Sequence, residues 1–191
     1  MEEKELVELS KSGDEEAFSL LVKKYSQKVF HLAFSLTQDR EMADDLAQET
    51  FIKAFYALPK FRHESAFGTW LYRITVNKAK DYFRKKARMS KMSQENLREG
   101  LHVEEDEFRR KEKELDQEQK RKLVYQCLQT LPQKHQVVLT LRDIQGMPYE
   151  KIADILSISP GTVDSRLHRA RKMLRKKLTP FLSKKGGSHE L

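Results

Sequence analysis

The sequence predicts an all-α protein made of two small helical domains joined by a flexible charged linker. Glycine and proline are scarce, at 7 and 5 of 191 residues, and no long run of alternating β-branched residues occurs. Apolar residues recur at helical spacing on both sides of a segment, about residues 92–116, that is dense in charge and poor in large apolar side chains. Such a segment cannot bury enough surface to fold alone. We therefore expect domains at residues 1–91 and 117–183, a linker at 92–116 and a tail at 184–191.

The first half of the chain carries the pattern of a short helix followed by three clear ones. Gly13 and Asp14 mark the first break, because glycine often ends a helix and aspartate often caps the next. From Phe18 to Leu36 apolar residues keep helical spacing for about five turns. A third helix is predicted at about residues 40–58 and a fourth at about residues 68–88.

The predicted third helix has a second informative face almost opposite its core stripe. This face consists of Asp45, Gln48, Glu49, Ile52 and Tyr56. An exposed polar face alone would be typical of any amphipathic helix. Apolar groups beside fixed acids instead favour a protein-binding surface, whose partner should be basic with an apolar centre.

The predicted fourth helix carries a basic stripe with aromatic residues near its start. The stripe consists of Arg73, Asn77, Lys80 and Arg84, and the aromatic residues include Phe67 and Trp70. Cations beside flat aromatic rings are typical of a surface that binds single-stranded nucleic acid. For Phe67 and Trp70 taken alone, ordinary core packing is the favoured alternative.

Residues 149–177 carry the pattern of a helix-turn-helix. A short helix is predicted at Tyr149–Leu156, then a turn, then a second helix with Ser159 as its N-cap and Pro160 as its first residue. The second helix has an apolar stripe formed by Val163, Leu167, Ala170 and Leu174. Its other face suits the major groove of DNA. A basic surface helix with a solvated face is the alternative.

The expected DNA-facing residues of this second helix are Thr162, Ser165, Arg166, His168, Arg169, Arg171 and Lys172. Arg169 lies opposite the apolar stripe and is expected to reach base edges. Arg166 and Arg171 lie at the flanks and are expected to contact phosphates, which position a helix without reading sequence.

Composition agrees with a nucleic-acid partner, since 37 Lys and Arg residues against 29 Asp and Glu residues leave a net charge of +8. The single cysteine, Cys127, lies in the apolar pattern of a predicted helix, so we expect no disulfide and a reducing compartment. No apolar run approaches membrane-spanning length, and the first residues lack the pattern of a signal peptide. We therefore expect a cytoplasmic protein without membrane insertion.

No pattern of an enzyme or of a cofactor site stands out. The histidines are scattered without ligand spacing, and Asp44 points away from the neighbouring Asp45 and Glu49. There is no nucleophile-and-base pattern and no glycine-rich phosphate loop. We expect no metal, no cofactor and no catalytic residue.

Three segments carry a resemblance to a known family. They are residues 44–58 (DDLAQETFIKAFYAL), 61–85 (FRHESAFGTWLYRITVNKAKDYFRK) and 149–171 (YEKIADILSISPGTVDSRLHRAR). In order and spacing they resemble the extracytoplasmic-function (ECF) sigma factors of bacteria, of the sigma-E kind. The resemblance implies sigma region 2 at residues 1–91 and sigma region 4 at residues 117–183.

By this resemblance, Asp45, Gln48, Glu49 and Phe51 belong to a motif that docks on the β′ clamp helices of RNA polymerase core. The resemblance also implies two further partners, the β flap of the polymerase and an anti-sigma factor. The loop at residues 61–69 and the helix after it would melt and read the −10 element, and the helix-turn-helix would read the −35 duplex. The implied function is promoter-specific transcription initiation, in an envelope or stress response. Family members often have Lys or Arg in place of Asp164 and can have an aromatic residue in place of His168, and both departures bear on −35 preference.

Two other classes stay open. A helix-turn-helix repressor or activator acting without polymerase core would bind a palindromic duplex by itself. A nucleic-acid enzyme would need metal ligands, and the candidate cluster of carboxylates is Asp44, Asp45 and Glu49, which no histidine or further acid joins.

Overall fold

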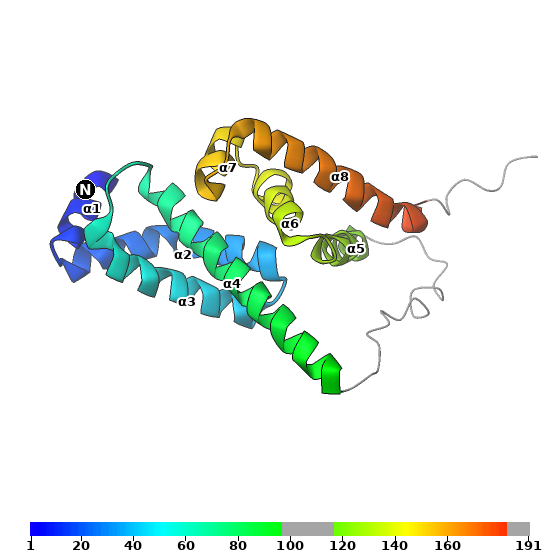
Figure 1. The fold of residues 1–191 in the computed structure, drawn as a ribbon. Helices are drawn as coiled ribbons and strands as arrows, with labels where there is room; N and C mark the ends of the chain where they lie inside the picture. Colours follow the sequence, from blue (N-terminus) through cyan, green and yellow to red (C-terminus); the bar gives the residue numbers. More distant parts are fainter. Residues whose placement is uncertain (97–116, 183–191) are drawn as a thin grey trace, which may run out of the picture.

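A computed structural model describes residues 1–96 and 117–182, and all of its described elements are helical turns or helices (Figure 1). The N-terminal domain contains α1 (Glu3–Lys11), α2 (Glu15–Thr37), α3 (Arg40–Ala57), the 3-10 turn η1 (Leu58–Lys60) and α4 (Phe67–Asn96). The C-terminal domain contains α5 (Gln117–Gln129), α6 (Gln133–Leu139), the π-helical turn η3 (Thr140–Ile144), α7 (Tyr149–Leu156) and α8 (Pro160–Leu182). The predicted all-α class is confirmed.

Local signals account for most helix ends. Asp14 caps α2 by accepting a hydrogen bond from the backbone N–H of Ala17 at 2.9 Å, after Gly13 takes a left-handed φ of 97°. Helix α4 continues to Asn96 instead of ending near Arg88, because no glycine or proline follows until Gly100. The first part of the predicted linker is therefore helical. Residues 97–116 and the predicted tail lie outside the described residues.

The buried apolar residues of the two domains form one continuous cluster. In the N-terminal domain α2 packs against both α3 and α4, and Leu21, Leu32 and Leu36 are fully buried. In the C-terminal domain Ile152 and Ile155 of α7 are buried against α8. Cys127 is a buried free thiol, and burial raises its pKa.

The two domains also pack against each other, which the sequence did not predict. Helix α4 lies beside α7 (Figure 1), and α2 lies beside η3. The amides of Gln129 and Gln136 both donate to the carbonyl of Leu36, at 2.8 and 3.1 Å, and Gln145 donates to Ser35 Oγ at 2.8 Å. Leu36 lies in the last turn of α2, where carbonyl groups have no partner within the helix. Glutamines of the C-terminal domain therefore supply the hydrogen bonds that a carbonyl group at the end of α2 lacks within its own helix.

Candidate polymerase and nucleic-acid interfaces

The outer face of α3 is open, as predicted. Asp45, Gln48 and Glu49 are exposed, and the side chains of Ile52 and Tyr56 are 57% and 78% exposed. The opposite face is buried in the core through Ala43, Leu46, Ala47, Thr50 and Ala54. Because the apolar groups lie on the same face as the acids, the surface suits a basic partner with an apolar centre.

Three residues refine this surface. Glu49 also pairs with Lys78 of α4, with Oε2 and Nζ 2.7 Å apart. Phe51 is half-buried and packs against the core, so it differs from the exposed residues of the predicted set. Phe55, which sequence reasoning missed, is 38% exposed and packs edge-on against Phe18 with ring centroids 5.1 Å apart. Phe55 follows Ile52 by three residues, and this spacing could have predicted from the sequence that the two lie on the same side of the helix.

The basic stripe of α4 is divided between solvent and the domain interface. Asn77 and Arg84 are exposed, and Arg84 pairs with Asp81 on the same helix. Arg73, in contrast, donates from Nη2 to the carbonyl of Asp154 in α7 at 2.6 Å, and its Nε is buried without a partner. Arg73 was predicted to face DNA, and in this arrangement α7 covers it.

Lys80 lies in the same interface. Its carbonyl accepts a hydrogen bond from the amide of Gln133 at 3.2 Å, and its side chain is half-buried. Burial lowers the pKa of Lys80, and the nearby positive charges of Arg166 and Arg84 lower it further. The basic stripe of α4 and helix α8 therefore bring like charges together, an arrangement that a bound anion would relieve.

The aromatic residues at the start of α4 form a cluster. Ring centroids lie 4.9 Å apart between Phe61 and Trp70 and 5.6 Å apart between Phe67 and Trp70. Phe67 is 4% exposed, so it is a core residue here and not a free stacking platform. Trp70 is half-buried and retains surface beside the stripe. Phe67 is buried because it lies one turn before Leu71 on the core stripe.

The helix-turn-helix matches its prediction at both boundaries. Ser157 ends α7 in the left-handed conformation, and Ser159 Oγ accepts from the backbone N–H of Thr162 at 3.2 Å. Val163, Leu167 and Ala170 are fully buried against the rest of the domain. Of the predicted DNA-facing set, His168, Arg169 and Lys172 are exposed, and Thr162, Ser165 and Arg166 are half-buried.

Arg171 has a different partner from the one predicted. Its Nη2 and Nε bind the two carboxylate oxygens of Asp143 in η3, at 2.6 and 3.1 Å. This pair raises the pKa of Arg171 above its ordinary value. The guanidinium is therefore paired with Asp143, and its predicted phosphate contact stays a prediction. Sequence periodicity does not report such a contact between separate elements.

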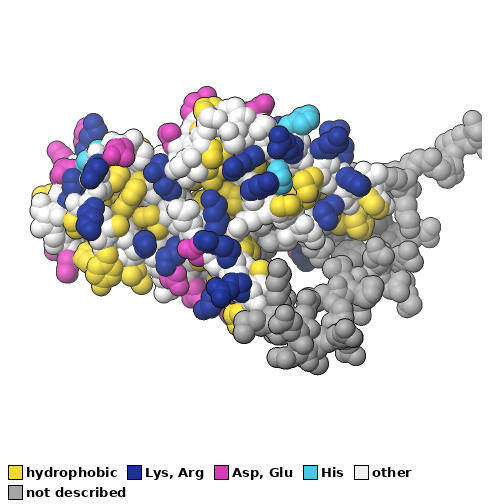
Figure 2. Space-filling model, in the orientation of Figure 1, with side chains coloured by type: hydrophobic (Ala, Val, Ile, Leu, Met, Phe, Trp, Pro, Cys, Tyr) yellow, Lys and Arg dark blue, Asp and Glu magenta, His cyan; other side chains and the backbone are white. Residues whose placement is uncertain are grey.

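Charge gathers where these surfaces lie. Lys and Arg side chains cover the outer part of α8 and the later turns of α4 (Figure 2). In the described part of the chain, no group of three or more His, Cys, Asp or Glu side chains could hold a metal ion. Among the helices described, none is long and apolar enough to span a bilayer.

Comparison with known proteins agrees with this geometry. The family model for sigma-70 region 2 matches residues 21–89, and that for sigma-70 region 4 matches residues 121–174. The chain is 40% identical to the RNA polymerase sigma-H factor of Pseudomonas aeruginosa, over 95% of this chain and 96% of that protein. It is 38% identical to the ECF RNA polymerase sigma-E factor of Escherichia coli K12, over 93% and 94%. The chain therefore belongs to the ECF family of RNA polymerase sigma factors.

Solved structures agree with this assignment. CnrH in complex with the cytosolic domain of CnrY has a TM-score of 0.63 and 27% identity, covering 95% of this chain and 97% of that one. The sigma factor RpoE of Bartonella quintana, solved with the anti-sigma factor NepR, has a TM-score of 0.62 and 25% identity, covering 85% and 96%.

Proposed function

We propose that this chain binds RNA polymerase core through the outer face of α3 and directs promoter-specific initiation through α4 and α8. The observation that carries the proposal is that two chemically different faces are open at once on rigid helices. The face of α3 combines acids with Ile52 and Tyr56, whereas α8 presents Arg169 and Lys172. A repressor acting alone would have no use for the first face.

The face of α8 supports the −35 assignment through its rigidity. Val163, Leu167 and Ala170, on the side of α8 away from Arg169, are fully buried, so the helix cannot rotate without exposing its core. A fixed recognition helix presents its side chains to the major groove with little loss of conformational entropy. Arg169 is the side chain we assign to a base edge.

The assignment of −10 contacts to α4 requires the domains to separate. Arg73 becomes available to DNA only after its bond to the Asp154 carbonyl breaks, and the half-buried side chain of Lys80 gains exposure when the domains separate. A promoter offers its two elements at a distance, and a tether between two readers allows the polymerase to set that distance. The free energy gained on binding polymerase would offset the free-energy cost of separating the two domains.

The proposal includes further partners and a place of action. The likeness to RpoE, which was solved with NepR, supports an anti-sigma factor as a partner of this chain. We propose that the chain acts in the cytoplasm, on DNA and polymerase, as a regulator and not as an enzyme.

The test is run-off transcription by core polymerase with and without the protein, on a genomic promoter library. New promoter-specific transcripts are expected only with the protein. In the variant Gln48→Ala with Glu49→Lys, core affinity should fall by about 30-fold or more, the range of interface hot spots. Asp44→Lys is the control, because Asp44 is exposed on the same helix outside the predicted face.

Because Glu49→Lys also breaks the pair with Lys78, Ile52→Ala serves as a second variant that leaves the pair intact. Ile52 is more than half exposed, so its loss should weaken core binding without lowering helix content. Core affinity equal to that of the parent in both variants would refute the docking surface.

A further inference from the structure

The loop of residues 61–66, between η1 and α4, is held at both ends within the N-terminal domain. Phe61 is buried, with its ring centroid 4.9 Å from that of Trp70 and 6.1 Å from that of Phe67. At the other end, the carbonyl of Ala66 accepts hydrogen bonds from the backbone N–H groups of Thr69 and Trp70, at 2.9 and 3.1 Å.

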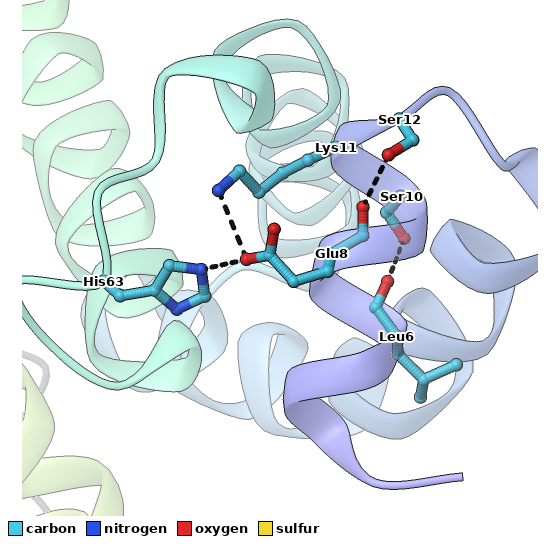
Figure 3. A network of polar contacts seen from close by, with 6 residues as sticks. All are labelled: Leu6, Glu8, Ser10, Lys11, Ser12 and His63. Atoms are coloured by element: carbon cyan, nitrogen blue, oxygen red, sulfur yellow. Dashed lines mark hydrogen bonds and ion pairs between the residues drawn. The ribbon is translucent and has the colours of Figure 1, made fainter.

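The middle of the loop is held by α1. His63 has a φ of 56°, a left-handed conformation that residues other than glycine seldom adopt unless their surroundings hold them there. Its ring packs on Phe61 with centroids 4.7 Å apart, and its Nε2 contacts Oε1 of Glu8 (Figure 3). Lys11 Nζ binds the same oxygen at 3.2 Å. Hydrogen bonds from His63 and Lys11 lower the pKa of Glu8, so this carboxylate is charged at neutral pH.

A second route also connects α1 to the start of α4. Glu3 Oε2 accepts a hydrogen bond from Tyr25 Oη at 2.8 Å, and the ring of Tyr25 packs edge-on against Phe67 with centroids 5.5 Å apart. Gly68 permits this approach, because a Cβ at that position would lie 2.8 Å from Tyr25 Cε1. Helix α1 therefore supports both the loop and the first turn of the helix that follows it.

We propose that α1 is a positioning element for promoter reading: Glu8, acting through His63, sets the conformation of residues 61–66 and thereby the base preference at the −10 element. This inference rests on the proposed contact of this loop and α4 with −10 DNA. Arg62 and Glu64, on either side of His63, are exposed, so the left-handed bend decides where these two side chains point. A loop released from Glu8 would carry the same side chains in many orientations, and selectivity would fall more than affinity.

The test compares holoenzymes, each containing core polymerase and the full chain, that carry Glu8→Ala, His63→Gly or His63→Asn. Glycine adopts the left-handed conformation without support but cannot bind Glu8, whereas asparagine tolerates this conformation and keeps an N–H donor. Glu16→Ala is the matched control, since Glu16 is an exposed carboxylate in the first turn of α2. Each holoenzyme is measured for opening of promoters substituted one base at a time in the −10 element, for −35 preference and for core affinity.

In Glu8→Ala and His63→Gly, discrimination among −10 variants should fall by about three- to tenfold, the effect of losing one hydrogen bond of typical strength. The −35 preference and core affinity should stay at the parent's values, and His63→Asn should restore part of the discrimination. The rate of trypsin cleavage after Arg62 in the free chain measures how firmly the loop is held when no DNA is present. It should be faster in Glu8→Ala and unchanged in Glu16→Ala.

An unchanged −10 profile in Glu8→Ala would overturn the proposal. So would a loss of equal size in −10 preference, −35 preference and core affinity, because α1 would then only support the fold. If the parent holoenzyme itself shows no −10 preference, the proposed function fails first. Cleavage at Arg62 distinguishes that failure from an error in the Glu8–His63 contact, because faster cleavage in Glu8→Ala shows that Glu8 holds the loop whether or not the loop reads DNA.

Discussion

Among the described helices, α4 and α8 are both long and rich in Lys and Arg, and they differ in what covers their charged face. Both carry an apolar stripe on one side and Lys or Arg on the other. On α8 the face around Arg169 is open, whereas on α4 Arg73 is bonded to the end of α7. A periodic pattern thus identifies residues that point away from their own domain's core. It does not identify those that a second domain then covers.

The difference has an energetic consequence. DNA can bind α8 without any rearrangement of the domains. Binding to the whole stripe of α4 requires loss of the bonds of Arg73 and of the glutamines that cap α2. The apparent affinity for single-stranded −10 DNA is then reduced by the fraction of molecules that are open.

The largest effect is expected from Arg169→Ala. This substitution should relax preference at one −35 base pair by about tenfold or more, the value of a bidentate contact between arginine and guanine. Lys172→Ala is the control, because an exposed lysine that contacts phosphate should weaken binding equally on all sequences and reduce the salt dependence. Binding of holoenzyme to −35 variants at two salt concentrations measures both. A uniform loss in Arg169→Ala would show that the wrong face of α8 has been assigned to the groove.

Arg73→Ala is the corresponding change on α4, and its effect should be smaller. It removes a proposed DNA contact and also the bond that holds α7 in place, and these two effects act in opposite directions. The affinity of the free chain for a single-stranded −10 oligonucleotide should therefore change by less than about threefold. Arg84→Ala serves for comparison, because Arg84 is exposed and pairs with Asp81 on its own helix, not with α7 as Arg73 does. Equal losses in both variants would mean that the closed arrangement does not limit binding.

Arg171→Ala separates a DNA contact from a structural one. The pair with Asp143 should contribute about 1 kcal/mol to the stability of the C-terminal domain, since both side chains are partly exposed. Thermal unfolding of Arg171→Ala, Asp143→Ala and the double variant should give non-additive losses. A uniform loss of −35 affinity in Arg171→Ala, with Asp143→Ala unaffected, would instead support the phosphate contact predicted from the sequence.

Opening the interface should raise −10 binding by a modest factor. Gln129→Ala with Gln136→Ala removes both donors to the Leu36 carbonyl. We expect a larger radius of gyration in X-ray scattering and about threefold tighter binding of a single-stranded −10 oligonucleotide. Binding to −35 duplex should not change. Gln126→Ala, at an exposed position of α5, is the control. A more open chain without tighter binding would contradict the inference that the C-terminal domain blocks DNA from the basic stripe of α4.

The features that the sequence predicted well depend on neighbours along the chain. The bounds of α7, the Ser159 cap and the buried stripe of α8 all follow from residues within a few positions of one another. The features that it missed join residues far apart, such as Gln136 with Leu36, 100 positions away, and Glu8 with His63, 55 positions away. Such contacts depend on how whole elements pack, and no local propensity or period reports them.

The substitution Asp164→Arg tests how open the face of α8 is. Asp164 is exposed near the start of the helix, where a carboxylate gains slightly from the helix dipole but repels DNA phosphate. Replacing it by arginine should tighten −35 binding by about two- to fivefold at low salt, and the gain should shrink as salt screens the charge. Asp164→Asn removes the charge without reversing it and should give part of the gain. Glu150→Arg makes the same charge change on α7 and is the control for net charge. An equal gain in Glu150→Arg would mean that the protein's overall charge, and not the position of Asp164 on an open recognition face, sets the affinity.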